Sequence, residues 1–166
     1  MDATTEFAVR SALVGAGATA VMDFWGLARK QLLGAPPPDY GLLGRWIAYL
    51  GRGRFRHDRI ADTPPVKGER VIGWASHYAI GIGFAALLLS ATGLDWARNP
   101  TLGPPLLLGV ATVAAPFLVM QPGMGAGIAA SRTPRPANAR LQSIVTHLVF
   151  GFGLYAAALA TAFLLK

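Results

Sequence analysis

The stretch Val71–Leu94 reads VIGWASHYAIGIGFAALLLSATGL and contains no Asp, Glu, Lys or Arg. A helix needs about 20 mainly apolar residues to cross the hydrocarbon core of a bilayer, so this stretch alone predicts a transmembrane helix. Three further stretches have the same apolar character: Phe7–Ala28, Leu102–Met120 and Ser143–Leu165. The sequence therefore predicts an all-α polytopic membrane protein with four transmembrane helices, which excludes most classes of soluble enzyme.

The composition of the chain also fits a small membrane protein. Its 166 residues are 53% hydrophobic and 14% charged, whereas soluble domains carry about 25% charged residues. Cysteine is absent, so disulfides and thiolate metal sites are excluded. We expect a single transmembrane domain over residues 1–166, with spans near 7–28, 71–94, 102–120 and 143–165 and with basic loops at 29–70 and 131–142.

Basic residues alternate between rich and poor segments along the chain. The loops 29–70 and 131–142 carry most of the Lys and Arg, whereas the segment before the first span and the connection 95–101 carry few. Short loops that retain Lys and Arg usually face the cytoplasm, so both rich loops are assigned to that side. An even number of spans then predicts that both termini are periplasmic in a bacterial inner membrane. This pattern explains the formal net charge of +7 without nucleic-acid binding.

A short helix is predicted over Tyr40–Leu50, inside the first basic loop. Apolar residues recur there at helical spacing, namely Leu42, Leu43, Trp46, Ile47 and Leu50. Such a helix could lie in the cytoplasmic interface of the bilayer, or it could pack on the ends of the spanning helices. The prolines at 36–38 are expected to end the preceding helix, because proline lacks an amide donor.

A run of arginines follows this predicted helix and consists of Arg52, Arg54, Arg56 and Arg59. The inside-positive rule explains the run, and contact with anionic lipid headgroups follows from it. His57 lies within the run, and we expect it to be solvated rather than to bind a ligand.

An internal repeat relates the second and fourth spans. Ser76-His77-Tyr-Ala-Ile-Gly81-Ile-Gly83 matches Thr146-His147-Leu-Val-Phe-Gly151-Phe-Gly153, and the first and third spans match weakly. The sequence therefore predicts two repeated helical hairpins, an arrangement found in transporters, and it allows a homodimer. Small residues let membrane helices approach closely. The glycines assigned to helix packing are Gly15, Gly81, Gly83, Gly151 and Gly153.

Four polar side chains are expected inside the bilayer: Asp23, His77, Gln121 and His147. Their spacing from the basic loops places all four ~9–16 Å inward from the cytoplasmic rim, at 1.5 Å per helical residue. Ionisable groups inside spans are costly, so each marks a candidate functional site. We predict that the four form a ligand-binding or proton-relay cluster.

Three roles for this cluster remain open. A buried hydrogen-bond network with Ser76 and Thr146 would only orient the helices. A relay or binding site would serve transport of a small solute, a proton or a metal. His77 and His147 could instead bind haem or a metal ion, with Met120, Met124 or Asp23 as further ligands of a metal. Motifs of nucleophilic, zinc or nucleotide-dependent enzymes are missing from the sequence, so a non-enzymatic role is favoured.

Four segments of the chain stand out together: Ala18–Asp23, Gly51–His57, Gly73–Gly81 and Met120–Pro134. These segments resemble a family of small four-helix bacterial inner-membrane proteins that is known only as a domain of unknown function. The resemblance covers most of the chain, and its last segment is the most specific. It implies a four-helix inner-membrane protein, and it implies no particular activity or catalytic residue.

Overall fold

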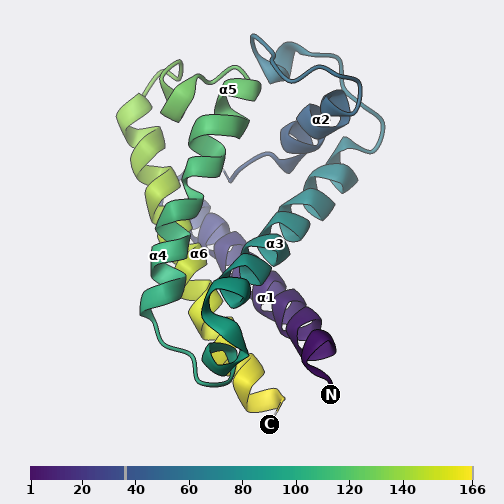
Figure 1. Ribbon diagram of the computed structural model, residues 1–166. Coiled ribbons are helices and arrows are strands. Elements are labelled where there is room, and N and C mark those ends of the chain that lie inside the picture. Colours follow the sequence, from purple (N-terminus) through teal and green to yellow (C-terminus); the bar gives the residue numbers. More distant parts are fainter. Residues whose placement is uncertain (36, 166) are drawn as a thin grey trace. The chain divides into compact units, whose positions relative to one another are not determined.

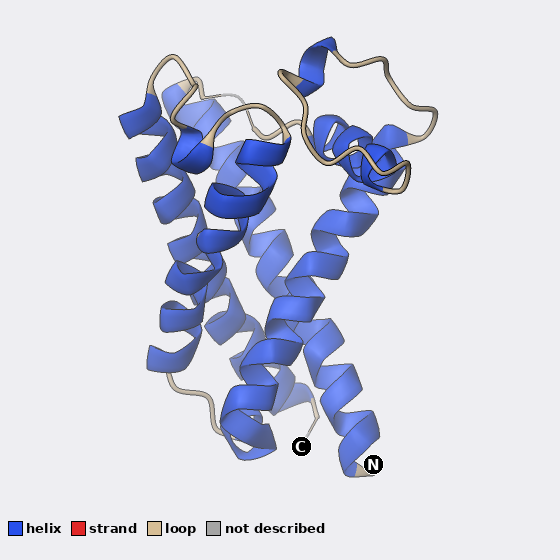
Figure 2. Cartoon of the chain, turned by 45° about the horizontal axis from the view of Figure 1, so that its top comes forward, coloured by secondary structure: helices blue, strands red, loops and turns tan. Residues whose placement is uncertain are grey.

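The computed structural model describes residues 1–35 and 37–165, and that part of the chain consists of helices joined by loops and turns, with no strands (Figures 1 and 2). Four helices are long and apolar enough to cross a membrane: Ala3–Leu33 (α1), Glu69–Arg98 (α3), Gly103–Gly123 and Pro136–Leu164 (α6). The predicted all-α class and the four spanning helices are therefore confirmed, and the protein has the build of a multi-pass membrane protein.

The helices α1 and α3 extend beyond their predicted apolar stretches at both ends, and α6 extends beyond its stretch at its start, where polar residues form the added turns. Asp2 caps α1 by accepting a hydrogen bond from the Thr5 amide at 3.0 Å, and this bond lowers the pKa of the Asp2 carboxyl. The other end of α1 is closed by Gly34, whose φ of 62° is left-handed. Apolar length reports only the membrane-embedded part of a helix, so it misses these polar turns. Pro36 lies outside the described residues.

The third span is broken into short helical pieces. It begins with α4 (Gly103–Thr112) and continues through a π-helical turn, η2 (Pro116–Met120), into α5 (Gln121–Gly123). The Gln121 amide donates to the Pro116 carbonyl, five residues back. Proline disrupts a regular helix, and at Pro116 the disruption takes the form of a π turn, which is frequent at functional sites. Two short 3-10 helices, η1 (Ile60–Asp62) and η3 (Ile128–Ala130), lie in the connecting segments.

The chain divides into two compact units, and each is described by itself. Unit 1 contains Met1–Pro37, Tyr78–Thr112 and Thr146–Lys166, and unit 2 contains Pro38–His77 and Val113–Val145. The start of α1 and the end of α6 lie at the same end of unit 1 (Figures 1 and 2). The buried core of unit 1 consists of Val14, Ala18, Ala85, Leu88, Leu89, Trp96, Ala97, Phe150, Leu154 and Ala158.

Helices in unit 1 cross where glycines meet backbone. A Cβ atom on Gly15 of α1 would overlap the Gly81 carbonyl and the Ile82 backbone of α3. A Cβ on Gly109 of α4 would lie 2.8 Å from the Cα of Gly151 on α6. The two helix pairs therefore cross at matching glycines, which are the positions that the internal repeat makes equivalent.

The second glycine of each repeat is used differently. Gly153 faces α1, where a Cβ would lie 3.0 Å from the Cα of Ala18. Gly83 is exposed and has no described atom within 4 Å of such a Cβ, so the packing role predicted for Gly83 is wrong. Positions two apart on a helix face different directions. Consequently α6 uses both of its glycine faces, whereas α3 uses only the face of Gly81.

Unit 2 is organised around α2 (Tyr40–Leu50), whose bounds match the predicted short helix. The α2 helix packs closely on the start of α3, since a Cβ on Gly44 would overlap the Glu69 carbonyl. Leu43 and Trp46 of α2 form a small buried core with Ile60. The α2 helix therefore packs against other parts of unit 2, and its location in the cytoplasmic interface of the bilayer stays a prediction.

Arg45 ties the loops of unit 2 to that core. Its guanidinium donates to both carboxylate oxygens of Glu69 at 2.8 Å and to the carbonyl of Thr63 at 2.8 Å. The same side chain reaches the carbonyls of Ile60 and Ala61 at 3.3 and 3.2 Å. These contacts with Glu69 raise the pKa of Arg45 above its ordinary value, so a single charged side chain holds the 60–63 turn against α3.

His57 is buried, contrary to the expectation of a solvated residue. Its side chain and backbone are 5% exposed. Its Nδ1 lies 3.0 Å from the Thr63 hydroxyl, and its amide donates to the Gly123 carbonyl at 2.9 Å. The arginines around it are exposed. The charged side chains of this run therefore face outward, whereas the histidine faces inward. Burial, with a smaller contribution from Arg54, lowers the pKa of His57.

Candidate intramembrane site

Asp23 and Tyr78 connect α1 to α3 within unit 1. The Tyr78 hydroxyl donates to Asp23 Oδ2 at 3.1 Å, in a partly buried position. A carboxylate inside a span needs such donors, because the hydrocarbon region offers no water in their place. Asp23 is thus placed as a hydrogen-bonded acid near the end of α1 that precedes the first basic loop.

His147 and Thr112 connect α6 to α4 in the same unit. The Thr112 hydroxyl lies 2.9 Å from His147 Nδ1, and it donates to the Gly109 carbonyl at 2.7 Å. When the single hydroxyl proton of Thr112 is on the Gly109 carbonyl, Nδ1 of His147 is the donor to Thr112. In that tautomer the lone pair of the imidazole is on Nε2, which is then the atom able to accept a proton or bind a metal.

Thr146 links the helix that carries His147 to α1. Arg29 donates from Nη1 to the Thr146 hydroxyl at 3.3 Å. Thr146 was expected in a network with the ionisable cluster, and its hydroxyl instead receives a cationic partner. This contact brings a positive charge to the residue next to His147 in sequence.

His77 belongs to unit 2, where it packs among aromatic rings. Its ring is stacked on Tyr40, with centroids 4.1 Å apart and an interplanar angle of 26°. Trp74 approaches the same ring edge-on at 6.0 Å. This environment supports a packing role for His77. His77 and His147 are equivalent in the repeat, but His77 contacts aromatic rings whereas His147 contacts a hydroxyl group.

Gln121 presents a buried acceptor in unit 2. Its Oε1 has no hydrogen-bond partner among the described residues. A buried amide oxygen without a hydrogen-bond donor costs free energy. A ligand or a water molecule could supply that donor at this position, which directly follows the π turn. The neighbouring methionines, Met120 and Met124, pack against the core of Leu43, Trp46 and Ile60.

The structure thus distributes the four predicted site residues between two units. Asp23 and His147 lie in unit 1, each with its own partner on another helix, and His77 and Gln121 lie in unit 2. Over the described residues, no group of three or more His, Cys, Asp or Glu side chains could hold a metal ion. The clustering of all four stays a prediction.

Sequence reasoning missed two residues that orient the site, Tyr78 and Thr112. Both had a signal in the sequence. Tyr78 directly follows His77 in the repeat, where the other copy has Leu148, and Thr112 lies three residues after the packing glycine Gly109. A polar residue present in one copy of a repeat and absent from the other would have identified Tyr78.

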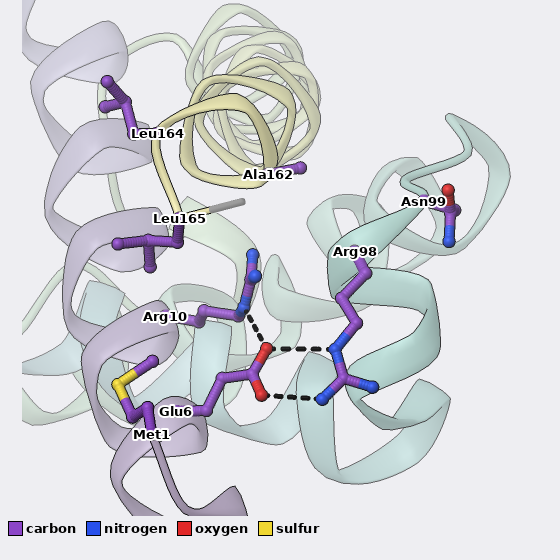
Figure 3. Close-up of a pocket in the computed structure, with 8 residues that line it drawn as sticks. All are labelled: Met1, Glu6, Arg10, Arg98, Asn99, Ala162, Leu164 and Leu165. Atoms are coloured by element: carbon purple, nitrogen blue, oxygen red, sulfur yellow. Dashed lines mark hydrogen bonds and ion pairs between the residues drawn. The ribbon is translucent and has the colours of Figure 1, made fainter.

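A second charged cluster was also missed, because it lies at the ends of the spans. Glu6 of α1 accepts hydrogen bonds from Arg10 at 2.8 Å and from Arg98 of α3 at 2.7 and 3.1 Å (Figure 3). Arg10 also donates to the carbonyl of Ala97 at 3.2 Å. These bonds fasten the start of α1 to the end of α3.

Comparison with known proteins identifies the family of this chain. The model of the family described as "Protein of unknown function (DUF2938)" matches residues 12–161, and the chain belongs to that family. No curated protein matches the sequence. No solved structure matches it either. The predicted family membership is confirmed, and the geometry above is the basis for any statement about activity.

Proposed function

We propose that this DUF2938 family member is a small membrane transporter that moves protons, alone or coupled to a small solute, through ionisable side chains inside its helices. The observation that carries the proposal is the orientation of His147 by Thr112, which leaves the Nε2 lone pair available. An imidazole held in this way can accept and release a proton without changing its rotamer.

Asp23 supplies the second proton-exchanging group. Its carboxylate receives the Tyr78 hydroxyl, so the charged form is stabilised by a donor that cannot itself neutralise it near neutral pH. Acid and imidazole side chains within spans are the usual elements of proton pathways. Both groups lie in unit 1 and are held by side chains of neighbouring helices.

Gln121 supports coupling to a solute rather than proton movement alone. Its unpartnered carbonyl oxygen needs a donor, and an amine, amide or hydroxyl of a small solute would provide one. The π turn before it exposes backbone groups that regular helix would use internally. Gln121 is therefore assigned to solute binding.

A flux measurement tests the proposal. The protein is reconstituted into liposomes that contain a pH-sensitive dye, and proton entry is driven by a potassium diffusion potential. Asp23→Asn and His147→Gln should each reduce the rate of proton entry. Asp95→Asn is the matched control, because it makes the same chemical change at a carboxylate whose side chain is 97% exposed.

Two results would contradict this function. Proton entry that equals the rate in empty liposomes would remove the basis for proton movement. Equal rates in wild type, Asp23→Asn and His147→Gln would place the pathway elsewhere. If joint apolar replacement of Asp23, Tyr78 and His147 preserved both fold and flux, the polar groups would be structural.

A haem or metal at His77 and His147 is checked on the same preparation. Haem gives an intense Soret absorption that His147→Gln would shift or abolish. Metal content is measured directly on the purified protein, and a colourless, metal-free sample that is still active in the flux measurement would exclude this role.

A further inference from the structure

The geometry points to a binding site for a small amphipathic anion in the cavity beside the Glu6–Arg10–Arg98 cluster, separate from the proposed proton pathway. The ligand class is a molecule with one carboxylate or phosphate head on a short apolar body. The cavity has a volume of about 710 Å³, within the range of about 300–1,000 Å³ typical of small-molecule sites. All of the residues that line it belong to unit 1.

One wall of the cavity carries two arginine side chains. Two guanidinium groups, those of Arg10 and Arg98, share the single carboxylate of Glu6. The side chain of Arg10 is 3% exposed, so water compensates little of its charge. Asp95 lies 3.2 Å from Arg98 but is almost fully exposed, and solvent screens that pair. Glu6 and Asp95 balance the two arginines in formal charge, and an anion in the cavity would gain charge-assisted hydrogen bonds by lying beside both guanidinium groups.

The opposite wall is apolar. The end of α6 contributes Ala162, Leu164 and Leu165, and Met1 adds a flexible thioether side chain (Figure 3). Figure 3 shows Leu164 and Leu165 on the side of Arg10 that is away from Arg98, and Met1 beside Glu6. A bare inorganic anion would use only the first wall, whereas a ligand with an apolar body would also cover the second, with a gain of about 25 cal/mol per Å² of buried apolar surface.

The position of the cavity suits a ligand that arrives from the membrane. It lies where α1 begins and α3 ends, which is the edge of the apolar spans. Amphipathic anions partition to this level of a bilayer, with their heads at the surface and their tails inward. The amide of Asn99 adds a neutral hydrogen-bonding group to the same cavity.

Photolabelling in vesicles tests this site. The protein is placed in phosphatidylcholine vesicles with a photoactivatable fatty acid, and labelled peptides are identified by mass spectrometry. Labelling is expected in the last turn of α6, at Ala162–Leu165. Excess laurate should compete, whereas dodecanol, which has the tail without the charge, and acetate or inorganic phosphate, which have the charge without the tail, should compete about tenfold less well.

Two variants separate binding from folding. Arg98→Gln removes one cationic group and should weaken labelling about tenfold. Ala162→Trp fills the cavity from its apolar wall without touching the ion pairs, and it should abolish labelling even if Arg98→Gln lowers stability. Arg56→Gln, an exposed arginine of unit 2, is the matched control. Labelling that survives Ala162→Trp, or equal competition by laurate and dodecanol, would overturn the proposal.

Discussion

Arg45 shows how much one side chain can hold in place. Its side chain is 11% exposed, and it donates hydrogen bonds to Glu69 and to three backbone carbonyls. Arg45→Met would remove these donors and leave Glu69 with the Val66 amide, which donates to its Oε2 at 2.9 Å. Removing one partner of a buried ion pair costs about 3–5 kcal/mol. We expect a marked loss of thermal stability in detergent. Arg59→Met is the control, because Arg59 and Asp62 form an exposed pair at 3.8 Å that contributes about 0–1 kcal/mol.

If Arg45→Met melted at the wild-type temperature, the contacts of Arg45 would be dispensable. The double variant Arg45→Met with Glu69→Leu refines the measurement. It removes the carboxylate that has lost its cation, but the carbonyls of Ala61 and Thr63 still lack the donor that Arg45 supplied. It should therefore recover only part of the lost stability.

His57 makes the stability of unit 2 depend on pH. Its pKa is lower in the folded protein than the ordinary value of 6.5, because burial disfavours the imidazolium form. The unfolded chain therefore binds a proton first as pH falls through 6.5, and the free energy of unfolding decreases there. Thermal melts at about pH 7.5 and about pH 5.5 should differ more for wild type than for His57→Gln. Equal differences in the two proteins would show that His57 protonates without cost.

Individual contacts were the least predictable features of the site. The sequence placed Asp23 and His147 inside spans, which follows from residue type and hydropathy alone. It could not assign Tyr78 to Asp23 or Thr112 to His147, because partner choice depends on how two helices are rotated about their axes. The prediction that His57 is solvated was wrong for a related reason. Its neighbours in sequence are charged, and its burial depends on a contact with Thr63, which the sequence does not reveal.

The glycine crossings make a prediction about whole helices. Gly81→Ala would drive a methyl group into the Thr19 side chain and towards the Gly15 carbonyl at 3.3 Å. Overpacking of this kind costs about 1–3 kcal/mol. Gly83→Ala is the matched control two residues away, where the space is open, and alanine there should be neutral or stabilising by up to about 1 kcal/mol. Thermal melts of the two variants compare them directly, and similar melting temperatures would contradict the described crossing.

Elements were predicted better than contacts. The bounds of α2 followed from apolar spacing and from the prolines before it, and the bounds of the spanning helices were missed only at their polar ends. The π turn was beyond sequence reasoning, because Pro116 predicts a break without specifying its geometry. Gly153 packs against another helix and Gly83 does not, because different helices surround the two copies of the repeat. Matching the two copies in sequence does not show which helices lie next to each copy.

The topology of the entire protein can be measured because the chain has no cysteine. Single cysteines at Arg59 and Asp95 would each give one site for a membrane-impermeant maleimide, and both side chains are well exposed. If the basic loops are cytoplasmic, Asp95→Cys should react from outside the inner membrane, and Arg59→Cys only after permeabilisation. The reverse pattern would invert the orientation, and labelling of both from outside would argue against the four-span arrangement.

The π turn of Pro116–Met120 has a consequence for how this segment tolerates change. Deleting Leu118 would leave the hydropathy of the span nearly unaltered, yet everything downstream would rotate by about 100° about the helix axis. The carbonyl oxygen of Gln121 would then aim at a different neighbour, although no functional residue had been replaced. The number of residues between Pro116 and Gln121 therefore fixes the direction of the Gln121 side chain. An insertion or deletion here would be more harmful than most exchanges of one apolar side chain for another.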